Sequence, residues 1–151
     1  TGTNIEHVPY RGSGPSMSDL LGGHIPMLVQ SVTGQALELH RTGKVRILAA
    51  TSDRPLTAAP TIPTVHQAGF PGLASQNFIG LFAPKGTPSA AVERVAQATR
   101  ETMADPEVQQ LFIAAGFEPE VDSSPQQARD LLDREIAKWA PVIKALGLKL
   151  D

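Results

Sequence analysis

The feature that most constrains this chain is the run HVPYRGSGPSMSDLLGG at residues 7–23. The β-prone residues 5–10 lead directly into a turn of small residues. Apolar side chains then recur at the three- and four-residue spacing of a short helix, at Met17, Leu20 and Leu21, and a pair of glycines ends the pattern. The run therefore predicts a strand, a tight turn and a short helix in direct succession.

The same order of elements is repeated along the next part of the chain. Residues 25–32 form a nearly continuous apolar run, typical of a strand buried on both faces of a sheet. Thr33 is placed to cap a second helix, which should end near Gly43, and residues 44–51 supply a third apolar run. Alternating strands and helices with short connections predict an α/β fold with a parallel sheet and right-handed crossovers.

Residues 52–72 differ in character because four prolines interrupt them. Apolar residues are interleaved throughout, which favours an ordered connector over a flexible linker. Within it, residues 64–69 could form one or two helical turns. Residues 77–83 predict another strand.

The remainder of the sequence predicts helices. Thr87 should cap the first of them, Asp105 should open the second and Ser124 should open the long third. Pro141 lies inside the third pattern and should kink it or divide it into two helices.

Composition excludes several classes of function. The 151 residues, 41% hydrophobic and 19% charged, can bury one core or two modest lobes. A net charge of −2, without a basic stripe, argues against nucleic acid as a partner. The chain has no cysteine, and its four histidines lack metal-ligand spacing. We therefore expect no metal, no cofactor and no catalytic residues.

The turn before the first helix is the best candidate site. The N–H groups of Gly12, Ser13 and Gly14, with the Ser13 hydroxyl, could receive a ligand carboxylate directly or through water, because a helix N-terminus attracts anions. Tyr10 could form a wall of the same site. The alternative is that Ser13 only caps the helix and the glycines only allow the turn.

Ser31 and Thr33 form the second candidate. They follow a predicted parallel strand, and ligands of such sheets bind beyond the carboxyl ends of the strands. The alternative is again a simple helix cap, which Thr33 suits well.

The motifs of this chain together resemble those of one family. They are VPYRG at residues 8–12, DLLGG at 19–23, RILAATS at 46–52, GFPG at 69–72 and GLFAPKGTP at 80–88. Their identity and order are similar to the signature of the tripartite tricarboxylate transporter substrate-binding proteins, also called the Bug or TctC-type family. The resemblance covers essentially the whole chain and places it in the C-terminal half of that family's sequence.

The resemblance implies a partial type II periplasmic-binding-protein-like fold, in which a ligand cleft lies between two α/β lobes. Residues 1–52 would form most of ligand-binding lobe two, and residues 53–78 would form a crossover or hinge segment. Residues 79–151 would supply a C-terminal strand and helices that pack on lobe one. The implied location is the periplasm, although this chain begins at Thr1 and shows no signal peptide.

The implied function is that of a solute receptor which binds a small organic anion, a carboxylate, and delivers it to membrane transporter subunits. Many family members carry Asp at the position of Gln30, and Gln favours a carboxylate ligand that has no amine. One alternative is a small α/β enzyme or effector-sensing domain that uses the same anion site. Another is a chain whose exposed apolar surface makes it self-associate.

Overall fold

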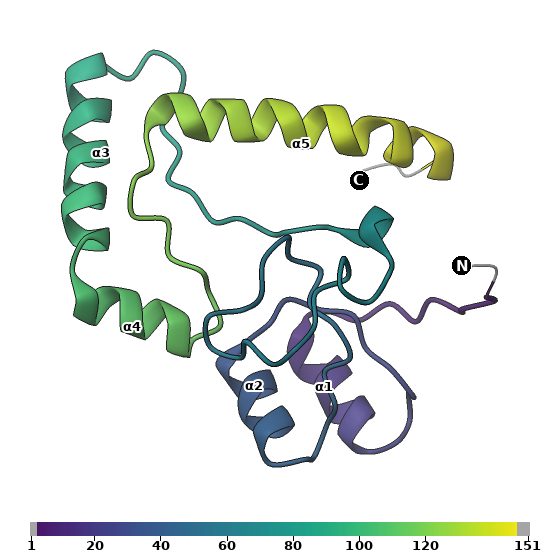
Figure 1. Cartoon of the computed structure of the whole chain (residues 1–151). Helices are drawn as coiled ribbons and strands as arrows, with labels where there is room; N and C mark the ends of the chain where they lie inside the picture. Colours follow the sequence, from purple (N-terminus) through teal and green to yellow (C-terminus); the bar gives the residue numbers. More distant parts are fainter. Residues whose placement is uncertain (1–2, 148–151) are drawn as a thin grey trace. The chain divides into compact units, whose positions relative to one another are not determined.

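A computed structural model describes residues 3–147, which form two compact units (Figure 1). Unit 1 extends to Asn77 and also contains Ala114–Phe117. Unit 2 contains Phe78–Ile113 and the chain from Glu118 onward. The first crossing from one unit to the other is therefore the peptide bond between Asn77 and Phe78.

Unit 1 contains the first two helices, α1 (Ser13–Leu21) and α2 (Gly34–Arg41). Both confirm predictions from the sequence. The Thr33 hydroxyl oxygen accepts a hydrogen bond from the backbone N–H of Ala36 at 3.2 Å, so Thr33 caps α2 as its position predicts. Each helix buries only a small surface, at Ser16 and Met17 in α1 and at Ala36 in α2.

The core of unit 1 forms between the proline-rich connector, which is ordered as predicted, and the chain before it. Ala50, Leu56 and Ile62 are buried together, and Leu37 of α2 packs against them. An isolated parallel bridge joins Ala50 to Thr64, with hydrogen bonds from Ala50 N–H to the Pro63 carbonyl (2.9 Å) and from Val65 N–H to the Ala50 carbonyl (2.8 Å). Residues 64–69 form hydrogen-bonded turns, and the short 3-10 helix η1 (Pro71–Leu73) follows.

The predicted parallel sheet is not present among residues 3–147, where the only β pairings are two isolated bridges. The segments expected to be strands (5–10, 25–32, 44–51 and 77–83) are irregular apart from the bridge at Ala50, and several of their apolar side chains are exposed: Val29 is 85% exposed, Leu48 68% and Ile79 80%. The physical reason is that a strand buried on both faces needs a paired neighbour on each side and a covering layer. The described chain supplies neither to these segments.

Unit 2 holds α3 (Ser89–Met103), most of α4 (Pro106–Ala114) and α5 (Pro125–Leu146). Helices α3 and α5 contact each other, and none of the described residues of the three helices is fully buried. No described helix of the chain is both long and apolar enough to span a membrane.

The helices of unit 2 begin where capping residues in the sequence predict, with one exception at the start of α3. Ser124 caps α5 by accepting from Gln127 N–H at 3.2 Å, and α5 runs through Pro141 as one helix rather than two. Asp105 Oδ1 accepts from Glu107 N–H at 2.8 Å at the start of α4. The prediction that Thr87 caps α3 is wrong: its hydroxyl donates to the Pro84 carbonyl (2.8 Å), because it lies one residue too early and is used in the preceding turn.

Candidate functional site

The turn before α1 holds three predicted site residues in an open arrangement. Gly12 is the N-cap residue, with φ 104° and ψ 174°, a conformation essentially restricted to glycine. Within residues 3–147, nothing accepts a hydrogen bond from the N–H groups of Gly12, Ser13 and Gly14. Gly12, Ser13 and Gly14 are all exposed, and a Cβ atom added at Gly12 or Gly14 would meet no atom within 4 Å.

Ser13 does not cap α1, so the capping alternative for it is wrong. It is the first residue of the helix, and no side chain caps the N-terminus. Ser16 instead donates its hydroxyl proton back to the Ser13 carbonyl at 3.0 Å. The N-terminus of α1 therefore keeps unpaired donors and the positive end of the helix dipole, which is the arrangement that attracts an anion.

Tyr10 is held by a pair of residues that the sequence analysis did not single out. Its hydroxyl donates to Asp19 Oδ2 at 2.7 Å, and Nδ1 of His24 lies 3.2 Å from Asp19 Oδ1. The hydrogen bond from Tyr10, followed by that from His24, lowers the pKa of Asp19, and the same bond to Asp19 raises the pKa of Tyr10. The Tyr10 hydroxyl proton is thus already used, and the ring as a wall of the site stays a prediction.

This hydrogen-bonded group fastens the chain before the turn to the second half of α1. The residues lie nine and five positions apart along the chain, a spacing that no local rule links. The Tyr10 contact ties the chain before Gly12 to α1, and the His24 contact ties the chain after α1 to the same residue of the helix.

The N-terminus of α2 is more closed than that of α1. Its first amide, Gly34 N–H, donates to the Ala115 carbonyl at 3.0 Å, and a Cβ at Gly34 would lie 2.6 Å from the Ala114 carbonyl oxygen. The Thr33 oxygen accepts from Ala36, which leaves the Thr33 hydroxyl proton as a donor. The structure thus supports the capping role of Thr33 and still allows it to donate to a ligand.

Ser31 has a partner that the sequence analysis missed. The side-chain amide of Asn77 donates through Nδ2 to Ser31 Oγ at 2.6 Å, although 46 residues separate them in the chain. Both side chains are exposed. Gln30, which precedes Ser31 in the sequence, has a buried Oε1 atom without a hydrogen-bond partner among residues 3–147. The predicted site residues therefore form two groups in unit 1, around Gly12 and around Ser31, and no hydrogen bond joins the two groups within the described chain.

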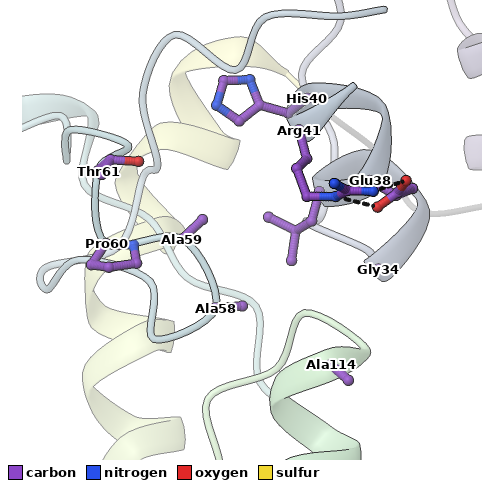
Figure 2. A pocket seen from close by; sticks show the side chains of 10 residues that line it. Gly34, Glu38, His40, Arg41, Ala58, Ala59, Pro60, Thr61 and Ala114 are labelled. Atoms are coloured by element: carbon purple, nitrogen blue, oxygen red, sulfur yellow. Dashed lines mark hydrogen bonds and ion pairs between the residues drawn. The ribbon is translucent and has the colours of Figure 1, made fainter. Parts of the chain in front are cut away.

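A separate hollow of about 620 Å³ lies against α2 (Figure 2). None of the six predicted residues lines it. Its charged groups are already paired: Arg41 donates through Nε and Nη2 to the two oxygens of Glu38, at 2.8 and 2.7 Å. His40 uses Nδ1 to accept from Ile47 N–H at 3.2 Å. The arginine that lines this hollow is therefore already paired with an acid. Within residues 3–147 no group of three or more acidic or histidine side chains could hold a metal ion.

The comparisons with known proteins agree on one family. Residues 1–148 match the family model described as the tripartite tricarboxylate transporter family receptor. The chain is 34% identical, over 99% of its length, to Protein BugT of Bordetella pertussis. Among solved structures it is similar to "R. palustris Rpa4515 with adipate" (30% identity, 97% of this chain, TM-score 0.82) and to periplasmic binding protein BugD (27% identity, 98% of this chain, TM-score 0.75).

The chain spans about half the length of these relatives: 45% of BugT, 48% of the adipate-bound structure and 50% of BugD. The fold it shares with them is therefore that of one half of a periplasmic binding protein. The family is one of receptors and not of enzymes. With nearly every residue matched by the family model, this chain belongs to the tripartite tricarboxylate transporter (Bug/TctC) receptor family.

Proposed function

We propose that this chain is the ligand-binding part of a periplasmic solute receptor, that it binds a small organic carboxylate, and that it delivers the ligand to the membrane subunits of a tripartite tricarboxylate-type transporter. In this proposal residues 1–52 belong to lobe two, residues 53–78 form the crossover, and residues 79–151 pack on lobe one. Membership of the receptor family and the adipate bound to a relative that is 30% identical support the carboxylate ligand.

The observation that carries the proposal is the set of unpaired amides at Gly12, Ser13 and Gly14. A carboxylate has no donor of its own when ionised, so it requires donors from the protein. Charge-assisted bonds to such amides are worth about 1.5–3 kcal/mol each. Two such bonds would give a small dicarboxylate measurable affinity. Ser31 and Thr33 supply further hydroxyl donors, and the Tyr10 ring supplies a wall.

Thermal unfolding of the 151-residue chain with a panel of ligands tests this proposal. The melting temperature should rise with adipate or succinate in a saturable way, because a ligand that binds only the folded state stabilises it. Adipamide, the neutral diamide of adipate, should produce no rise. If no carboxylate in the panel shifts the melting temperature, the proposal is wrong.

A charge variant locates the site within that experiment. Ser13→Asp places a carboxylate in the first turn of α1, where it should stabilise the helix by about 0.3–1 kcal/mol while repelling an anionic ligand. Ser18→Asp is the matched control, because it makes the same change at an exposed position later in the same helix. We expect only the Ser13 variant to lose the response to adipate.

A further inference from the structure

Asn77 is bound to a candidate ligand residue but was not predicted as part of the site. Its Nδ2 atom lies 2.6 Å from Ser31 Oγ, and it is the last residue of unit 1 before the chain passes into unit 2 at Phe78. The bond is short for an N–H donor and a hydroxyl acceptor, and both side chains are exposed to solvent. An exposed polar pair that is fixed in this way has its remaining hydrogens available to a solute.

The direction of the bond decides what the pair can bind. A serine hydroxyl has one donor hydrogen and two acceptor lone pairs. Because Asn77 donates to the Ser31 oxygen, the Ser31 hydrogen has to point away from Asn77. Asn77 keeps its second Nδ2 hydrogen as well. Two donors on adjacent atoms thus remain, and hydrogen bonds in a chain strengthen one another, which makes the Ser31 hydroxyl a better donor.

Two neighbouring donors match the two oxygens of one carboxylate group. They match a carboxamide poorly, because its NH₂ group would face one of the donors and leave that donor unsatisfied. We propose that Asn77 is a further ligand-binding residue of the carboxylate site, which together with Ser31 binds one carboxylate group and discriminates it from a carboxamide. This inference rests on the proposed function and adds to it a residue and a basis for specificity.

The competing explanation is that the bond only ties residue 77 to residue 31. Asn77→Asp separates the two explanations. An aspartate of the same size can still bond to Ser31, because the serine hydroxyl can donate to it, so the tie remains. The substitution removes the free N–H donor of residue 77 and turns the Ser31 hydroxyl hydrogen toward the aspartate, away from the ligand. It also places a negative charge next to the ligand carboxylate.

The experiment compares the affinity for adipate and for adipamate, its monoamide, by NMR titration of the 151-residue chain. For the chain itself we expect adipate to bind more tightly than adipamate. Asn77→Asp should weaken adipate binding by at least about 10- to 100-fold, the equivalent of losing one donor to a charged acceptor, with a melting temperature close to that of the unchanged chain. Asn4→Asp is the control, because it changes the only other asparagine, also exposed, by the same charge.

The variant Ser31→Ala should weaken adipate binding as well, and combining it with Asn77→Asp should add little, because the two residues act as one unit. Equal affinity of the Asn77→Asp variant and the unchanged chain for adipate would overturn the inference and leave the proposed function standing. Absence of adipate binding by the unchanged chain would overturn both.

Discussion

Substitution by alanine should change the free energy of unfolding in opposite directions at two glycines, one just before α1 and one in its first turn. Gly12 has φ 104° and ψ 174°, whereas Gly14 lies in α1 with ordinary helical geometry. A Cβ atom would meet nothing within 4 Å at either position, so steric contact with other residues does not distinguish them. The backbone conformation alone separates the two sites.

The magnitudes follow from those conformations. Gly12→Ala forces an alanine into a region that is essentially restricted to glycine, which costs about 1–3 kcal/mol. Gly14→Ala replaces a flexible residue inside a helix and should stabilise the chain by about 0.5–1 kcal/mol. The two variants should therefore differ in free energy of unfolding by about 1.5–4 kcal/mol, although they add the same methyl group two residues apart.

Urea unfolding followed by circular dichroism at the helix band measures both values. The slope of free energy against urea concentration should be the same for the two variants and the unchanged chain, so that a change in midpoint reports stability. Equal shifts in one direction would show that Gly12 does not hold the described conformation. The geometry of the proposed anion site would then be wrong as well.

Further predictions concern the cap of α2, the acid group behind the turn, the core and the association state. Thr33→Ala should lower the free energy of unfolding by about 1 kcal/mol, and Thr33→Ser should lower it by much less. The matched control is Ser124→Ala, which removes the corresponding 3.2 Å cap of α5. A Thr33→Ala variant as stable as the unchanged chain would contradict the cap. The pKa of Asp19 is lowered from its ordinary value of 3.8, so its contribution to stability is present above pH 3.8 and is lost as the pH falls through the lower folded pKa. The Asp19→Asn variant should lose that part of the acid dependence in a pH series of melting temperatures. An acid profile that the substitution leaves unchanged would refute this prediction. Ile62→Ala should destabilise by about 2–5 kcal/mol in urea unfolding, since Ile62 is only 2% exposed at the centre of the unit 1 core; a loss below 1 kcal/mol would place Ile62 outside that core. Light scattering of the 151-residue chain should show species larger than a monomer, because Val29 and Ile79 leave large apolar surfaces exposed; a strictly monomeric solution at high concentration would refute this.

The parts of the fold that the sequence predicts are those set by neighbouring residues. The caps at Thr33 and Ser124 and the end of α5 at Gly147 depend on contacts within four residues, and all are found where local rules place them. Thr87 shows the limit of such rules, since a cap and a preceding turn compete for one hydroxyl and the turn uses it.

The features that the sequence could not supply depend on partners far away in the chain. The apolar run around Val29 indicates a buried strand, but pairing depends on which segment lies beside it. The contacts of Tyr10 with Asp19 and of Ser31 with Asn77 join residues 9 and 46 positions apart. No periodicity links such positions, so Asp19 and Asn77 emerge only from the coordinates, whereas the glycine-rich turn of the anion site is visible in the sequence itself.

We propose that the unpaired amides of Gly12, Ser13 and Gly14 bind a carboxylate. The most direct measurement is an amide NMR titration of the 151-residue chain with adipate. We expect these three resonances to move downfield together and to saturate along one binding curve. Adipate binding that leaves these amides unmoved while other resonances shift would contradict it.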